Sequence, residues 1–253
     1  MSKILKKLFL IKIGGRLLEF ENGFNNFISG LKRLYPKVAL VIVHGGGKEL
    51  SSWLTRLKVK YHFVGGQRFT NKEAITIAEM VLSGKVNKHI VSRLNKRGLK
   101  SVGLSLKDGG ICELNQIKGL GFVGKPKKVK TDLLNVLILN GFIPVISTIG
   151  FDKKGNTLNV NADWVCPALA KALKADRMIY LTDVSGIIDK VGNTIPIIKI
   201  SQIEKLINDG VIHSGMIPKV RSAKDAINKG IREIDILNGV NGLEFNSGTR
   251  ILK

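Results

Sequence analysis

Residues 38–47 read VALVIVHGGG, an apolar run that passes directly into a histidine and three glycines. A short apolar run bounded by glycines is typical of a strand that is buried on both faces of a parallel sheet. The earlier run LFLIKI, residues 8–13, ends in the same way at Gly14 and Gly15. Both runs therefore predict parallel strands whose carboxyl ends open into glycine-rich turns.

Beyond these two runs, short apolar segments alternate with segments in which apolar residues recur at helical spacing. This alternation indicates βαβ units and a mostly parallel sheet with helices on both faces, which is the α/β class. We predict a seam near residues 174–175, where a new strand begins. The expected strands are residues 8–13, 38–43, 101–106, 142–147, 177–181 and 233–237, and the expected helices are residues 24–34, 49–57, 71–82, 85–97, 131–140, 163–174, 201–209 and 219–229.

Length and composition exclude several classes of protein. A chain of 253 residues with 44% hydrophobic residues can bury a core, so we do not expect a disordered protein. No apolar run approaches the roughly 18 residues of a membrane span, so we expect no membrane partner. The start resembles a signal peptide, but Lys12 interrupts its apolar part and no cleavage site follows, so we expect a cytoplasmic protein. Cys112 and Cys166 form neither a zinc motif nor a disulfide framework.

The charge is strongly basic, since 41 Lys and Arg residues against 19 Asp and Glu residues give a net charge of +22. Such a balance raises a nucleic-acid hypothesis. The lysines are spread along the chain, however, and no aromatic residues interleave with the densest run, KPKKVK at residues 125–130, as stacking platforms would. We interpret the charge as a solvated surface and predict no nucleic-acid partner. An anionic partner, such as a nucleotide phosphate, stays open.

The two glycine turns favour a phosphate site. Glycines let a ligand approach the backbone closely, and the N–H groups that open the following helix favour an anion. Neither turn is a P-loop, because Ile42 stands where the first glycine of that motif belongs and Glu49 follows Lys48. The sequence GLGFVG at residues 119–124 is followed by Lys-Pro rather than by a helix start, so we reject it as a dinucleotide motif.

Four further segments carry polar groups in loops or at helix starts. Arg68 lies in GGQRFT, residues 65–70, where its planar guanidinium suits a carboxylate clamp. NVNAD, residues 159–163, holds two Asn and one Asp, which is more than a helix cap requires. TDVSG, residues 182–186, follows a strand, and GMIPK, residues 215–219, opens a helix with a lysine in its first turns.

Taken in order, the motifs resemble those of the amino acid kinase family. They are KIGG, VIVHGGG, GGQRFT, GFIPVIS, NVNAD, LTDVSG and GMIPK. MVLSGKVNK at residues 80–88 and GTR at residues 248–250 further resemble the branch that phosphorylates N-acetyl-L-glutamate with ATP in arginine biosynthesis. The resemblance covers essentially the whole chain. It implies a three-layer α/β/α sandwich, with a lobe at residues 1–174 that binds the amino acid and dimerises and a lobe at residues 175–253 that binds ATP.

The same resemblance implies roles for particular residues. Lys12 and Lys219 would stabilise the transferring phosphoryl group, and Asp163 would hold both lysines in position. The acetylglutamate would be bound by Gly46, Gly47, Arg68 and Asn159, and ATP by Gly14, Gly15, Gly45, Asp183, Val184, Ser185, Gly186, Ile187, Val211, Ile212 and His213. No residue is assigned to a metal, because Mg²⁺ would be held mainly by the nucleotide phosphates.

The implied reaction accounts for these residue types. A side-chain carboxylate is already ionised at pH 7, so the nucleophile needs no general base, and Asp163 is interpreted as an organiser. The difficulty is the repulsion between an anionic nucleophile and a polyanionic donor. Positioning and charge neutralisation overcome it, and lysines, backbone N–H groups and Mg²⁺ supply both.

Three features depart from the family pattern. Pro167 removes a backbone donor early in the helix after NVNAD, and the bulky Trp164 stands beside Asp163. Only 11 residues precede Lys12, which leaves no room for the N-terminal helix of arginine-inhibited hexameric relatives. We therefore expect an arginine-insensitive homodimer.

Two alternative functions stay open. One is a kinase for glutamate or aminoadipate bound to an acidic carrier protein, which the positive charge would suit. The other is a relative without catalysis that binds nucleic acid or senses an amino acid, although the joint presence of Lys12, Asp163 and Lys219 argues against it.

Overall fold

The computed structural model describes residues 6–182, 184–213 and 216–253. Its centre is an eight-stranded sheet in the order β12-β14-β13-β11-β1-β2-β8-β5. Neighbouring strands pair in parallel except β13 and β14. The predicted α/β class is therefore confirmed. The strands of this sheet are β1 (Leu8–Ile13), β2 (Ala39–His44), β5 (Ser101–Ser105), β8 (Ile143–Ser147), β11 (Arg177–Thr182), β12 (Ile197–Lys199), β13 (Glu233–Asn238) and β14 (Thr249–Leu252).

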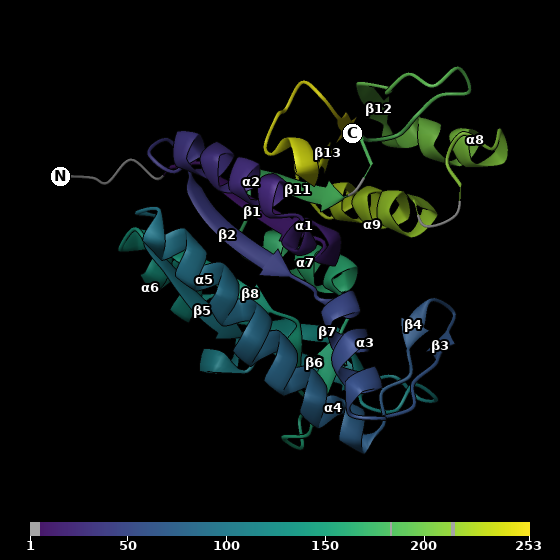
Figure 1. Cartoon of the computed structure of the whole chain (residues 1–253). Coiled ribbons are helices and arrows are strands. Elements are labelled where there is room, and N and C mark those ends of the chain that lie inside the picture. The colour runs from purple at the N-terminus through teal and green to yellow at the C-terminus, as the bar shows by residue number, and fades with distance from the viewer. Residues whose placement is uncertain (1–5, 183, 214–215) are drawn as a thin grey trace.

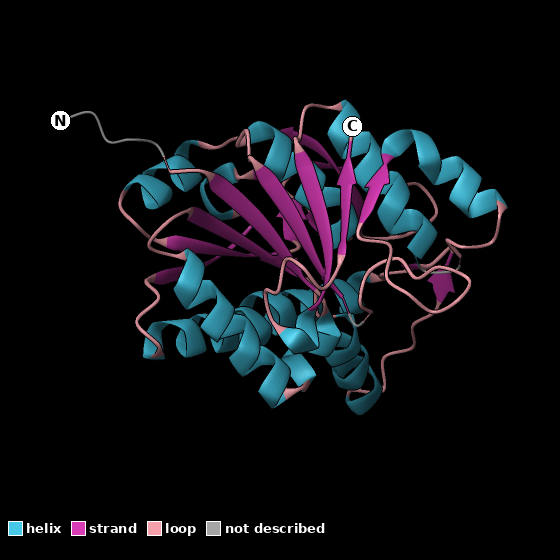
Figure 2. Cartoon of the chain, turned by 90° about the horizontal axis from the view of Figure 1, so that it is seen from above, coloured by secondary structure: helices cyan, strands magenta, loops and turns pink. Residues whose placement is uncertain are grey.

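Helices cover both faces of the sheet, which confirms the three layers (Figures 1 and 2). Side chains alternate along a strand, so Phe9, Ile11 and Ile13 of β1 pack into one core and Leu10 into the other. The first core lies under α1 (Gly15–Glu19), α2 (Glu21–Leu34), α3 (Gly47–Arg56), α4 (Lys72–Ala78) and α5 (Asn87–Lys96). The second lies under α6 (Asp132–Leu139), α7 (Ala162–Ala172), α8 (Ile203–Asn208) and α9 (Met216–Asn228).

A small closed barrel, which we did not predict from the sequence, lies beside the main sheet. It consists of β6 (Cys112–Gln116), β7 (Val123–Val129), β9 (Ile149–Phe151) and β10 (Thr157–Val160). A separate hairpin joins β3 (Phe63–Val64) to β4 (Gln67–Arg68). Because β10 ends two residues before α7 begins, the barrel fixes where that helix starts.

The prediction of separate helices at residues 71–82 and 85–97 was wrong. The chain stays helical throughout, since α4 runs into a π-helix, η1 (Glu79–Val86), which runs into α5. Gly84 lies inside this continuous helical stretch, and a glycine costs a helix only about 1 kcal/mol. Burial of Val81, Leu82 and Val86 outweighs that cost.

Two strands that we did not predict, β12 and β14, form one side edge of the sheet. Arg250 of β14 donates from Nε to Oδ1 of Asp235 at 2.8 Å, and Arg177 Nη1 lies 3.4 Å from Asp235 Oδ2. Burial raises the pKa of Asp235, and the two arginines oppose that shift. This cluster ties β11, β13 and β14 together. The sheet is continuous across residues 174–175, and the division into lobes there stays a prediction.

Across the described ranges, no helix combines the length and the apolar character that a bilayer crossing demands.

A buried polar contact connects the end of β2 to α5. The Nδ2 atom of Asn87 lies 3.0 Å from Nε2 of His44 and 2.9 Å from the carbonyl oxygen of Val145. An amide nitrogen only donates, so His44 Nε2 accepts, and the ring hydrogen is on Nδ1, which donates to the Gly45 carbonyl at 2.7 Å. Burial lowers the pKa of His44 from 6.5 to about 4, so the ring is neutral at pH 7.

We predict that His44 makes the fold less stable in mild acid. Because its pKa of about 4 in the folded state is below the ordinary value of 6.5, the unfolded chain takes up the proton first. The stabilisation is complete above pH 6.5 and is lost as the pH falls toward 4, by about 2 kcal/mol between pH 7 and pH 5. Urea titrations of the parent and of His44→Gln at both pH values measure it. Equal changes in the two proteins would contradict the prediction.

Candidate active site

The two glycine turns lie side by side at one edge of the sheet. Strands β1 and β2 are parallel neighbours in which Ile13 pairs with His44, so the turns that follow them begin at the same level. A Cβ atom added to Gly15 would lie 3.8 Å from the Cα atom of Gly46. The turns form part of the wall of a cavity of about 240 Å³.

This cavity brings together eight of the residues that the sequence predicted for the site. They are Lys12, Gly14, Gly15, Gly45, Gly46, Gly47, Arg68 and Asn159. The sequence did not single out three further polar residues of the wall as ligands, namely Gln67, Thr148 and Asn161. Gln67 and Asn161 lie inside quoted motifs, whereas Thr148 follows a predicted strand and could have been found by its position at the carboxyl end of that strand.

Lys12 and Asp163 form an ion pair across the sheet–helix boundary. Lys12 lies on the same face of β1 as Leu10, which is the face that α7 covers. Its Nζ atom lies 3.1 Å from Oδ1 of Asp163, and the two side chains are only 11% and 17% exposed. The Asn161 side chain caps α7 by accepting from the Asp163 backbone N–H at 2.9 Å. The carboxylate is therefore fixed at the first turn of α7.

Lys219 lies on α9, which packs on α7. The Ser222 hydroxyl donates to the Asp163 carbonyl at 2.8 Å and lies 3.2 Å from the Tyr180 hydroxyl. Residues three apart share a face of a helix, so Lys219 lies on the face of α9 that meets the start of α7. The three predicted catalytic residues therefore belong to three elements, β1, α7 and α9, of which α7 packs against both of the others.

The second glycine turn is shaped by close packing. Gly46 has a φ of 151°, and a Cβ atom there would lie 2.6 Å from Cδ2 of Leu82 in η1. Only glycine fits such a position. Helix α3 begins at the next residue, Gly47, and the first N–H groups of a helix have no partner within it. The turn therefore presents backbone donors of the kind that bind anions.

Arg68 is held rigidly at the cavity wall. Its Nη2 atom donates to the Gly47 carbonyl at 3.0 Å and to the Ser51 hydroxyl at 2.6 Å. The guanidinium carbon lies 4.5 Å from the ring centre of Tyr61 and 4.7 Å from that of Phe63. Burial lowers the pKa of Arg68, but a guanidinium stays charged. Its Nη1 atom is buried and makes no hydrogen bond to any described residue.

The predicted ATP-binding residues after β11 lie outside the cavity. Asp183 is not among the described residues. Ile187 donates from its N–H to Thr249 Oγ1 at 2.7 Å, and Asn238 Nδ2 lies 3.3 Å from Ser185 Oγ, so the loop is tied to β13 and β14. Val184, Gly186, Val211, Ile212 and His213 do not line the cavity either. Since Leu181 of β11 pairs with Ile13 of β1, the loop nevertheless starts beside the first glycine turn.

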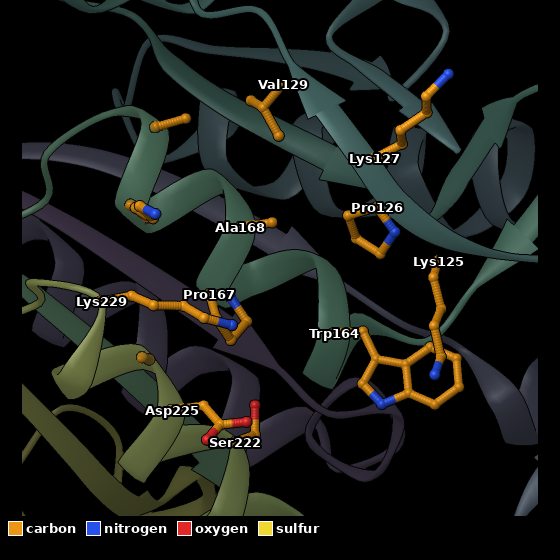
Figure 3. A pocket seen from close by; sticks show the side chains of 13 residues that line it. Lys125, Pro126, Lys127, Val129, Trp164, Pro167, Ala168, Ser222, Asp225 and Lys229 are labelled. Atoms are coloured by element: carbon orange, nitrogen blue, oxygen red, sulfur yellow. The ribbon is translucent and has the colours of Figure 1, made fainter. Parts of the chain in front are cut away.

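A larger groove of about 610 Å³ runs along α7 between β7 and α9 (Figure 3). Trp164 forms one wall, and the Lys125 ammonium lies 5.0 Å from the centre of its ring. Pro167 faces this groove, and α7 continues past it to Ala172. None of the predicted site residues lines the groove, so the cavity at the glycine turns is the candidate active site.

Sequence and structure relate this chain to proteins of one family. The sequence model described as the amino acid kinase family matches residues 7–238. Acetylglutamate kinase of Endomicrobium trichonymphae is 40% identical over 98% of this chain and all of that protein, and acetylglutamate kinase of Campylobacter curvus is 42% identical over 94% and 86%. The structure of smu.665 from Streptococcus mutans UA159 is 29% identical, covers 97% of this chain and 98% of its own, and has a TM-score of 0.85. The chain belongs to the amino acid kinase family.

Proposed function

We propose that this protein transfers the γ-phosphoryl group of ATP to the side-chain carboxylate of N-acetyl-L-glutamate, giving N-acetyl-L-glutamyl 5-phosphate for arginine biosynthesis. One observation carries the proposal: a single cavity is lined by Lys12, which is ion-paired with Asp163, by two glycine turns and by Arg68, whose Nη1 makes no hydrogen bond to any described residue. Relatives about 40% identical to the chain, and named acetylglutamate kinase, support the choice of substrate.

Charge neutralisation is the main task of the site. The acceptor carboxylate and the ATP phosphates are both anionic, so they repel each other at the moment of attack. Lys12 at the cavity wall, Lys219 and the N–H groups of the glycine turns would stabilise the charge that moves onto the β-phosphate and the transferring group. The carboxylate attacks without losing a proton, so no base is required.

Asp163 would act on the lysines rather than on the substrate. A lysine on a long flexible stem loses entropy when it is fixed, and the ion pair at 3.1 Å keeps Lys12 at the end of β1 before the substrates arrive. The same first turn of α7 meets the face of α9 that carries Lys219. Asp163 would thus align one lysine from the sheet and one from a helix.

Arg68 and Asn159 would orient the acetylglutamate. Arg68 lines the cavity, where its guanidinium would pair with a substrate carboxylate. The aromatic rings of Tyr61 and Phe63 fix the plane of the guanidinium, which favours a planar partner. Asn159 lies across the cavity in β10, where its amide can serve the acetamido group.

The nucleotide would extend from the glycine turns toward the loop after β11. Gly14, Gly15 and Gly45 would hold its phosphates, and Val184–Ile187 with Val211–His213 would form walls for the rest. The described residues contain no group of three or more His, Cys, Asp or Glu side chains suited to a metal ion. Mg²⁺ would therefore be carried mainly by the phosphates, where it supplies positive charge.

We further propose that the protein is a homodimer joined through β5 and α6. Strand β5 is an edge of the main sheet, so its outer hydrogen-bonding groups have no neighbouring strand in that sheet. Near it, α6 exposes Val136 (57%) and Leu139 (47%), and Phe142 follows at 37%. A two-fold contact would cover this apolar surface and the strand edge together.

The activity itself is tested with hydroxylamine, which traps an acyl phosphate as a hydroxamate. We expect hydroxamate to form only when ATP, Mg²⁺ and N-acetyl-L-glutamate are all present. Glutamate and N-acetyl-L-aspartate serve as controls for the acetyl group and for the chain length. Release of ADP without hydroxamate would refute the proposed acceptor.

We predict that Lys12→Ala and Lys219→Ala each lower kcat by roughly 10²–10³-fold, which is the effect of removing one preorganised donor from a transition state. The hydroxamate assay measures the loss, and circular dichroism checks that each variant is folded. Lys100→Ala, an exposed lysine outside the cavity, is the matched control. A kcat within about threefold of the parent in either variant would remove that lysine from the mechanism.

We predict that Arg68→Lys raises the KM for acetylglutamate by roughly tenfold or more and changes the KM for ATP little. The lysine keeps the charge but loses the planar fork that pairs with a carboxylate. Steady-state kinetics with each substrate varied in turn measure both constants. The opposite pattern, with a raised KM for ATP alone, would place Arg68 at the nucleotide.

We predict that light scattering gives the mass of a dimer for the parent and of a monomer for Val136→Asp. A buried, unpaired carboxylate at an apolar interface is strongly unfavourable, whereas on a solvated surface it costs little. Val191→Asp changes an exposed valine far from β5 and should leave the dimer intact. A dimer that survives Val136→Asp would show that α6 is not the interface.

A further inference from the structure

The segment MVLSGKVNK contains one buried polar residue with no role in the proposed reaction so far. Asn87 is completely buried at the start of α5, directly after the π-helix η1. Its Nδ2 atom contacts the carbonyl oxygens of Val145 at 2.9 Å and Leu104 at 3.3 Å, in two adjacent strands. Its Oδ1 atom accepts from Lys88 Nζ at 3.3 Å. A carbonyl oxygen only accepts, so the amide nitrogen must face these strands; of its two hydrogens, one is directed to Val145 and the other to His44 Nε2, which is closer than the Leu104 carbonyl.

The orientation of Asn87 determines the hydrogen position on His44. Since Nδ2 faces His44 Nε2 at 3.0 Å, that ring nitrogen accepts, and Nδ1 must donate to the Gly45 carbonyl. The Gly45 carbonyl is thus turned toward the imidazole. In a trans peptide the N–H points opposite to the carbonyl, so the Gly46 N–H points away from the ring. Gly46 is part of the cavity wall.

The remaining groups of the glycine turn are already used within the backbone. The Gly45 N–H is directed at the Ile13 carbonyl at 3.4 Å, and the Gly46 carbonyl accepts from Leu50 at 2.9 Å. Leu82 of η1 closes the other side of Gly46. Within this glycine turn, that leaves the peptide between Gly45 and Gly46, and His44 restrains its carbonyl.

Building on the proposed function, we propose that Asn87 is a positioning residue: acting through His44, it holds the Gly45–Gly46 peptide with its N–H directed to the transferring phosphoryl group. Asn87 touches no reacting atom in this role. Without it, the ring could adopt the other tautomer, with the hydrogen on Nε2. Nδ1 would then face the Gly45 carbonyl as an acceptor, and the two would repel each other.

Gly103 lies so close to this amide that a side chain at position 103 would overlap it. A Cβ atom at Gly103 of β5 would lie 2.0 Å from Asn87 Oδ1, so alanine there must displace the side chain. Gly103→Ala therefore disturbs the amide without removing any polar group. The glycine has no positive φ, so alanine fits the backbone itself.

The test compares Asn87→Ala and Gly103→Ala with a matched control, Asn95→Ala. Asn95 lies in the same helix and binds the Ser101 backbone of β5 at 2.8 and 3.2 Å, so it ties the same two elements without touching His44. We expect kcat to fall roughly tenfold to hundredfold in the first two variants, with both KM values within about threefold. Asn95→Ala should keep the parent kcat. A kcat within about threefold of the parent in a folded Asn87→Ala would overturn the proposal.

A second measurement does not depend on enzymatic activity. Long-range ¹H–¹⁵N spectra of the parent report the tautomer of His44, with His44→Gln used to assign its signals. We expect a protonated Nδ1 and an unprotonated Nε2 at pH 7, and a changed tautomer population in Asn87→Ala. A parent with the hydrogen on Nε2 would overturn the inference. If the tautomer is as expected but the parent forms no acyl phosphate, the proposed function fails and the local geometry stands.

Discussion

The ion pair between Lys12 and Asp163 connects the central strand of the sheet to a helix that covers it, and the geometry of the site depends on it. Taking two charges out of water is costly, so such a pair is poor evidence of stability. The Lys12 Nζ and Asp163 Oδ1 atoms are 3.1 Å apart, and both side chains are mostly buried where β1 ends and α7 begins. The barrel strand β10 sets the start of α7, and Ser222 of α9 bonds to its first turn. Strand β1, helix α7 and the barrel strand before it thus meet at this ion pair.

Much of this arrangement could be predicted from the sequence, because apolar runs that end in glycines mark where the strands end. The runs LFLIKI and VALVIV were correctly predicted as strands of a parallel sheet, and their pairing in the structure places the two glycine turns together. Six of the eight predicted residues at the cavity meet there for that reason, whereas Arg68 and Asn159 come from β4 and β10. Alternation along β1 also placed Lys12 on the side of α7.

What could not be predicted depends on contacts between distant segments. Two helices were predicted at residues 71–82 and 85–97, yet the packing of η1 keeps the chain helical between them. The barrel strands are short, and β7 carries four polar or proline residues in KPKK, so no alternating pattern marked it. Asn87 lies in a segment of mixed residues, and only the fold shows that its amide reaches His44, 43 positions earlier. The groove beside Trp164 likewise exists only because β7 and α9 approach α7.

The central claim is that the phosphoryl group is transferred to the side-chain carboxylate of acetylglutamate. The most direct measurement is ¹³C NMR of N-acetyl-L-glutamate labelled at C1 and C5, incubated with the protein, ATP and Mg²⁺. A phosphoryl group attached through oxygen splits the signal of the carbon that carries it. We predict that the C5 signal becomes a phosphorus-coupled doublet while the C1 signal stays single. Consumption of ATP with both carbons unsplit, or with C1 split instead, would contradict the account.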